Sequence, residues 1–259
     1  MSYNDKTALV SAGLDLAEAM IKNGAEVSRI EDSVKRVFES YGAFKTDVLA
    51  ISSSIVATVV FPGIEPVTQT KRITETATDF EALSQLNQLC RDICAEKPSP
   101  DEIRERTEKI LKKAEDEPKS KRILRKFIAY ILAAGGFTVF FGGGIKELCA
   151  ASIVAVIIAC FELVFKKKGT NAAVYAYFCT LAAAVSTVLL CRLFGISSDT
   201  VIIGFIMIEI PGVMFTNSVR DIFLGDTISG ALKMLESLLL AVSIACGVAS
   251  ALFITGGRV

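Results

Sequence analysis

Histidine and net charge are both missing from this 259-residue sequence. Without histidine, a Ser-His-Asp triad has no base, and we predict no enzymatic activity. The 28 Lys and Arg residues balance the 28 Asp and Glu residues, whereas a nucleic-acid-binding protein normally carries a clear basic excess. The first 19 residues are charged and lack the apolar core of a secretory signal peptide. We therefore expect the N-terminal part to stay in the cytoplasm and to bind no nucleic acid.

Cysteines are few and odd in number. Cys90 and Cys94 are four residues apart, so on a helix they share a face, and a redox pair or half of a metal site is conceivable. No histidine and no second cysteine cluster completes such a site, which favours structural cysteines in a reducing compartment. We predict no metal and no cofactor. The other five cysteines lie in hydrophobic runs, where cysteine behaves as a small apolar residue: Cys149, Cys160, Cys179, Cys191 and Cys246.

Charge divides the chain into two parts. Residues 1–126 hold 20 of the 28 basic and 21 of the 28 acidic residues. We predict a cytoplasmic α+β domain at 1–118, a basic linker at 119–126 and a transmembrane domain at 127–259.

Five hydrophobic runs follow the linker, each close to the ~20 residues that span ~30 Å of hydrocarbon as a helix. Five such runs in series predict a five-helix transmembrane bundle. Small residues recur at helical spacing, for example at Ala151, Ala155 and Ala159, and this predicts close helix packing. The runs are 127–145, 148–165, 172–191, 201–219 and 235–254.

The positions of Lys and Arg predict the orientation of the bundle, because basic loops face the cytoplasm. The segment before the first run is basic, and the loop after the second run contains Lys166, Lys167 and Lys168. We predict a multi-pass protein of the plasma (inner) membrane with a cytoplasmic N-terminus and an external C-terminus. We also expect Glu162 to reach toward the three lysines.

The N-terminal domain shows alternating helical and strand patterns. Apolar residues at three- and four-residue steps predict helices over 5–23 and 26–41, followed by two more over 79–94 and 101–113. The region 46–74 is rich in β-branched residues and contains the turn signal Pro62-Gly63, so it predicts a small antiparallel sheet. Glu26 and Arg29 have the spacing of a helical ion pair. We predict helices flanking a small sheet.

Residues 207–230 carry the most informative pattern. Ionisable and helix-breaking residues are costly in hydrocarbon and often mark a solute path. The competing interpretation is a tight kink between packed helices, with the charges at the water interface. Glu209 lies within its run without a neighbouring cation, which suits either a proton-binding group or a hydrogen-bonded structural glutamate. The candidate substrate-binding residues are Glu209, Pro211, Gly212, Asn217, Arg220 and Asp221.

A run of three glycines, Gly142, Gly143 and Gly144, lacks the strand and the Lys-Ser/Thr of a phosphate loop. We predict instead that it breaks or tightly packs the end of the first span.

Three segments together resemble the threonine/serine exporter (ThrE) family, and more narrowly its YjjP-type larger subunit, which carries a soluble domain and five spans. They are GAEVSRIED at 24–32, FFGGGIKELCAA at 140–151 and IPGVMFTNSVRDIFLGDTISG at 210–230. The resemblance covers nearly the whole chain. In the family the position before Ile210 is commonly apolar, so a coupling role for Glu209 would be particular to this protein.

The resemblance implies a half-subunit of a secondary exporter of small polar metabolites, either threonine and serine or succinate-type dicarboxylates. Its expected partners are a companion five-span membrane subunit of the same family, membrane lipids and the small-molecule substrate. The alternative is a membrane-anchored scaffold or sensor, whose cytoplasmic domain binds a partner and whose spans do not transport.

Overall fold

The computed structural model describes residues 3–51, 53–74, 79–115, 118–165 and 170–256. The chain forms two compact units, which are described separately. The first contains Met1–Glu117 and Thr216–Lys233, and the second contains Pro118–Phe215 and Met234–Val259. Lys166, Lys167 and Lys168, on which part of the predicted orientation depends, lie outside the described residues.

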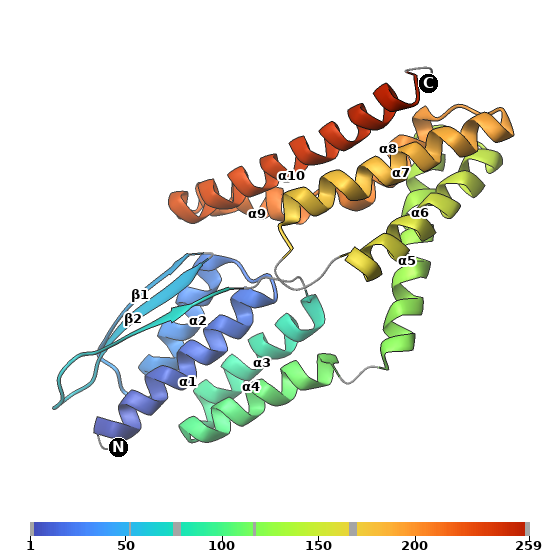
Figure 1. The fold of residues 1–259 in the computed structure, drawn as a ribbon. Helices are drawn as coiled ribbons and strands as arrows, with labels where there is room; N and C mark the ends of the chain where they lie inside the picture. Colours follow the sequence, from blue (N-terminus) through green and yellow to red (C-terminus); the bar gives the residue numbers. More distant parts are fainter. Residues whose placement is uncertain (1–2, 52, 75–78, 116–117, 166–169, 257–259) are drawn as a thin grey trace. The chain divides into compact units, whose positions relative to one another are not determined.

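Four helices and a sheet build the N-terminal part of the first unit (Figure 1). The strands pair in the order β1-β2-β3, all antiparallel, with Ile51 opposite Ser54 in the first hairpin. The predicted small antiparallel sheet is thus confirmed, and so are the four predicted helices. The elements are α1 (Tyr3–Lys22), α2 (Val27–Ser40), β1 (Lys45–Ile51), β2 (Ser54–Val60), β3 (Val67–Arg72), α3 (Phe80–Glu96) and α4 (Pro100–Glu115).

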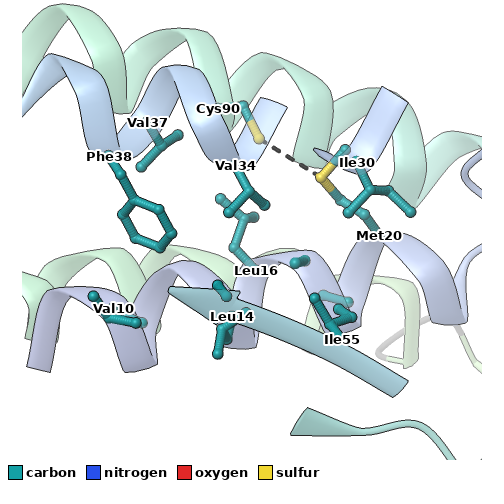
Figure 2. Packing of buried hydrophobic residues seen from close by; sticks show 14 of the residues in the cluster. Val10, Leu14, Leu16, Met20, Ile30, Val34, Val37, Phe38, Ile55 and Cys90 are labelled. Carbon is teal, nitrogen blue, oxygen red and sulfur yellow. Dashed lines mark hydrogen bonds between the residues drawn. The ribbon is translucent and has the colours of Figure 1, made fainter. Parts of the chain in front are cut away.

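Helix α1 is the centre of this unit. It packs against the sheet on one side and against α3 and α4 on the other, so half of its 20 residues are buried, including neighbouring positions such as Leu9 and Val10. The buried positions therefore cover more than one face of the helix, while Asp15 and Glu18 remain partly exposed and form ion pairs with Lys71. Figure 2 shows Leu14, Leu16 and Met20 of this helix among the side chains of α2 and β2. Phe38, which is fully buried, fills the space left by Gly13, where a Cβ would lie 2.6 Å from the ring.

The second unit consists of apolar helices. They are α5 (Lys119–Phe140), α6 (Ile145–Phe165), α7 (Ala172–Phe194), α8 (Asp199–Glu209), the start of α9 (Gly212–Phe223) and most of α10 (Thr227–Ile254). Four helices, α5, α6, α7 and α10, are long and apolar enough to cross a membrane, and α8 with α9 forms a bent pair that raises the number to as many as five. The basic segment 119–126 forms the first two turns of α5.

Small side chains make the contacts between these helices. Ala151, Ala155 and Ala159 are fully buried, which confirms the predicted close packing. A Cβ at Gly204 of α8 would lie 2.0 Å from the Thr138 hydroxyl of α5. A Cβ at Gly247 of α10 would lie 2.1 Å from the Thr180 hydroxyl of α7. The backbones therefore approach more closely than any larger side chain allows.

Candidate functional site

The helix α8 stops at Glu209, and α9 starts at Gly212 with its axis turned by 55°. Ile210 is extended, with φ −61° and ψ 127°, as expected for a residue before proline. Pro211 has no N–H, so it cannot donate to the carbonyl of Met207 as a helical residue would. The apolar stretch is thus interrupted, and backbone carbonyls next to Glu209 are left available to other donors.

Glu209 is half-buried and lies close to polar groups of other helices. The thiol of Cys179 on α7 donates to its Oε1 at 3.9 Å. Tyr130 and Tyr175 interact electrostatically with both Glu209 and Glu162. The sequence around Glu209 contains no cation, but folding gives this carboxylate neighbours from α5 and α7.

Glu162 on α6 makes two short polar contacts within the second unit. It accepts a hydrogen bond from the Tyr130 hydroxyl at 2.6 Å and pairs with the Lys126 ammonium at 2.6 Å. Its side chain is 10% exposed, against 31% for Lys126. We expected Glu162 to reach toward the lysines at 166–168, which lie outside the described residues, and did not predict Lys126 or Tyr130 as its partners. Lys126 and Tyr130 are four residues apart, so they share a face of α5, but this spacing does not indicate that the face meets Glu162 on α6.

The other three candidates lie on α9 in the part that belongs to the first unit. Arg220 donates from Nη1 to Oε1 of Glu26 at 2.7 Å. Asp221 is fully buried and binds the Lys233 ammonium at 2.8 Å. Asn217 is half-buried. Arg220 and Asp221 therefore do not pair with each other: Arg220 binds Glu26, and Asp221 binds Lys233.

Glu26 was expected to pair with Arg29, and among the described residues the structure gives it Arg220 instead. The two residues are 194 positions apart, so no local spacing rule could predict the contact. Helix spacing permits a Glu26–Arg29 pair but does not require it, because exposed ion pairs of this kind gain little free energy.

Two further carboxylates of the first unit, Glu31 and Asp226, interact electrostatically with each other. Glu31 of α2 accepts a hydrogen bond from the Ala50 N–H at 2.7 Å. Burial raises its pKa, the Ala50 bond opposes this, and the negative charge of Asp226 adds to the rise. The pKa of Asp226 is raised as well, by burial and then by Asp221, while Lys233 lowers it. Protonation is thus easier here than at an ordinary surface carboxylate.

The glycine run forms the turn between α5 and α6. Gly142 has φ +94°, a conformation that favours glycine. A Cβ at Gly143 would lie 2.7 Å from the Thr138 methyl group. The Gly144 N–H donates to the Glu147 carboxylate at 2.9 Å, which satisfies one free donor at the start of α6. The described residues include no group of three or more acidic or cysteine side chains placed to hold a metal ion.

Comparison with known proteins identifies the family to which the chain belongs. The profile of the threonine/serine exporter family, ThrE, matches residues 12–255. The chain belongs to this family. It is also similar to a Corynebacterium glutamicum protein named threonine/serine exporter, with 26% identity over 256 residues, covering 95% of this chain and 51% of the relative. The chain thus spans about half the length of that relative. No solved structure matches the chain significantly.

Membership of the ThrE family confirms the resemblance that the three sequence segments indicated. Together with the apolar helices, it identifies the chain as a membrane protein. Two of those segments meet in the structure. Glu26 of the first segment binds Arg220 of the third, within the first unit. The middle segment forms the turn between α5 and α6.

Proposed function

We propose that this ThrE-family chain is one half of a secondary exporter that moves threonine and serine, or succinate-type dicarboxylates, across the plasma membrane. The observation that carries the proposal is the bent α8–α9 pair, in which a carboxylate and a proline interrupt an apolar segment. Discontinuous helices in transporters bind substrates and coupling ions with backbone groups that an intact helix would use internally. The relative from Corynebacterium glutamicum is named a threonine/serine exporter, which supports the amino acids as substrates.

Within the second unit we assign Glu209, Pro211 and Gly212 to the solute path. Pro211 removes one helical hydrogen bond, and Gly212 has open space where a Cβ would be. The freed carbonyls suit the ammonium group of an amino acid. The carboxylate of Glu209 is suited to bind and release a proton during transport. The thiol of Cys179 is one of the hydrogen-bond donors to this carboxylate.

Within the first unit we assign Asn217 and Arg220 to contact with the substrate. The guanidinium of Arg220 is 58% exposed and uses Nη1 for Glu26, while a guanidinium carries five N–H donors in all. Its planar fork can bind both oxygens of a carboxylate, which lysine cannot do. Asp221 is fully buried against Lys233, so we propose that it positions α9.

We propose that a second membrane half completes the transporter, because this chain covers only 51% of its relative. The half would resemble the part of the relative that the chain does not match. Purification in mild detergent from cells that express both proteins should recover a stable complex. Full transport by this chain alone in liposomes would show that the second half is not required.

We further propose a cytoplasmic N-terminus, five spans and an external C-terminus, from the distribution of Lys and Arg. Cysteines introduced singly at Thr170 and at Lys146, in a background without other cysteines, test this orientation. Position 146 should react with an impermeant maleimide in intact cells, and position 170 only after permeabilisation. The reverse labelling pattern would contradict the orientation.

The experiment that tests the function is metabolite efflux from cells that lack or overproduce the chain. We expect threonine, serine or succinate to leave faster on overproduction, and Arg220→Lys to export much less at normal expression. Unchanged efflux of all three on both deletion and overproduction would favour a scaffold or sensor. Near wild-type efflux by Arg220→Lys would place the substrate site elsewhere.

A further inference from the structure

A cavity of about 780 Å³ lies between α2 and α3 of the first unit, and the proposed transport path does not use it. Three arginines, Arg29, Arg36 and Arg91, line this cavity together with a single carboxylate, Asp32. The remaining lining residues supply hydroxyl, amide, thiol and apolar groups: Ser33, Phe80, Leu83, Ser84, Asn87, Cys90 and Cys94.

Helical periodicity places the polar groups on two walls of the cavity. On α2 the polar residues Arg29, Asp32 and Arg36 recur at steps of three and four, while the opposite face is buried, for instance at Ile30 and Val34. On α3 the polar residues Ser84, Asn87 and Arg91 recur in the same way. The two helices pack together, so one cation-bearing face of each borders the same space.

The positive charge of the cavity is only partly neutralised. Arg36 pairs with Asp32 at 2.8 Å, but the two side chains are 70% and 57% exposed, so the pair is weak. Arg91 donates from Nε to the amide oxygen of Gln88 at 3.0 Å, and this acceptor is neutral. Among the described residues no ion pair includes Arg29. The cavity thus carries two more positive than negative charges.

Elsewhere in the same unit arginine is used differently. Arg104 binds the carboxylate of Asp15, and Arg106 binds those of Glu96 and Glu102. These arginines join α4 to α1 and α3 and are neutralised by protein groups. The contrast indicates that the arginines of the cavity are available to an anion from solution.

We propose that this cavity binds a small metabolite with at least two carboxylate or phosphate groups. Guanidinium forks bind both groups bidentately, and three forks provide more donors than a single anionic group can use. The volume lies within the usual range of small-molecule sites. Phe80, 59% exposed, and Leu83 offer an apolar wall to the body of such a ligand. The site would let the soluble part of the chain respond to the metabolite on its own side of the membrane.

Calorimetric titration of the full chain in neutral detergent at physiological salt tests the proposal. The probes are inorganic pyrophosphate and ATP for phosphate groups, and citrate for carboxylate groups. We expect saturable binding of at least one probe, weakened about tenfold for each of Arg29→Gln and Arg91→Gln, because each variant removes a charge-assisted hydrogen bond to the anion. The two kinds of probe show which anionic group is recognised.

Arg72→Gln on β3 is the matched control, because it removes the same charge from the same unit outside the cavity. It should bind like the wild type, whereas Asp32→Asn should bind more tightly, because it removes the one carboxylate of the cavity. Failure of all three probes to bind saturably would overturn the proposal. So would an Arg72→Gln effect as large as that of Arg29→Gln.

The thiol of Cys94 reports where a probe binds. Burial raises the pKa of Cys90 to about 12, which keeps it a poorly reactive thiol, whereas Cys94 is half-buried and lines the cavity. In a variant with Cys94 as its sole cysteine, a bound probe should slow maleimide labelling. An unchanged rate at saturating probe would place the anion elsewhere and overturn the proposal. Both measurements read binding directly, so their outcome is independent of whether the chain exports threonine.

Discussion

The two units differ in which side chains they bury. In the first, large side chains such as Phe38, Phe61 and Met20 are fully buried. Ion pairs such as Arg36–Asp32 and Lys112–Glu108 lie at its surface, whereas the Lys233–Asp221 pair is buried. In the second, the buried positions are mostly small or hydroxyl-bearing. Large apolar side chains there point outward, such as Leu132 at 69% and Phe253 at 87% exposed. The buried small residues include Ala134, Thr138, Ala150, Ala151, Ala155, Thr180, Ala183, Ala184 and Thr187.

This difference is the one expected between a domain in water and a helix bundle in lipid. In water, removal of large apolar surface supplies most of the free energy of folding. In lipid the surroundings are as apolar as leucine, so helices associate through close packing of small residues and through polar contacts. The Gly204–Thr138 approach and the Lys126–Glu162–Tyr130 contacts are of this second kind. The comparison therefore predicts which substitutions damage each unit.

The largest effect is expected for Phe38→Ala in the first unit. Removal of a fully buried aromatic side chain typically costs 3–5 kcal/mol, and the fully buried ring of Phe38 fills the space beside Gly13. Phe44→Ala is the control, because Phe44 is 71% exposed. Thermal unfolding of the full chain in detergent should show a strongly lowered transition for Phe38→Ala only. Equal shifts for both variants would contradict the assigned core.

A smaller loss is expected for Gly204→Ala in the second unit. One added methyl group would meet Thr138 Oγ1 at 2.0 Å and the Ala134 carbonyl at 2.8 Å, and overpacking typically costs about 1–3 kcal/mol. Gly136→Ala on α5 meets nothing within 4 Å and should be neutral or slightly stabilising, because alanine favours helix. The yield of folded protein and its melting temperature measure both. A stable Gly204→Ala variant would refute the close α5–α8 approach.

Lys126→Met tests the polar contacts of the same unit. Loss of one partner of a fully buried ion pair costs 3–5 kcal/mol. Because Lys126 is 31% exposed, we expect about 1–2 kcal/mol. Tyr130→Phe removes one hydrogen bond to Glu162 and should cost less, about 1 kcal/mol. If Lys126→Met were as stable as the wild type, the Lys126–Glu162 ion pair would not stabilise the unit, and the prediction would be wrong.

The smallest effect concerns pH and the first unit. The folded pKa of Glu31 is raised above 4.5, so folding disfavours the ionised form. Its contribution to stability is complete below the unfolded pKa and is lost as pH rises through the folded value. Glu31→Gln keeps an acceptor for the Ala50 N–H but cannot ionise, so its stability should not fall over the pH range in which Glu31 loses its proton. The variant should gain stability relative to wild type from about pH 4.5 to pH 7, and a gain toward acidic pH would contradict the assignment.

Local patterns predicted most elements because their causes are local. β-Branched composition and the Pro62-Gly63 turn signal predicted the sheet. Three- and four-residue apolar steps predicted α2 and α3, and the length of the apolar runs predicted the membrane helices. Pro211 and Gly212 predicted an interruption, and the structure adds the 55° bend. Contacts between distant elements could not be predicted in this way. Glu26 meets Arg220 and Lys126 meets Glu162 only because of how helices pack, and one sequence does not encode that packing in any short spacing.

We have proposed that this chain, together with a second membrane half, exports threonine and serine or succinate-type dicarboxylates. Flux of labelled threonine through liposomes that contain both purified halves tests it most directly. We expect saturable flux with the two halves together, little flux with this chain alone, and a strong reduction for Arg220→Lys. If threonine, serine and succinate all crossed no faster than in empty liposomes, the proposed function would be wrong.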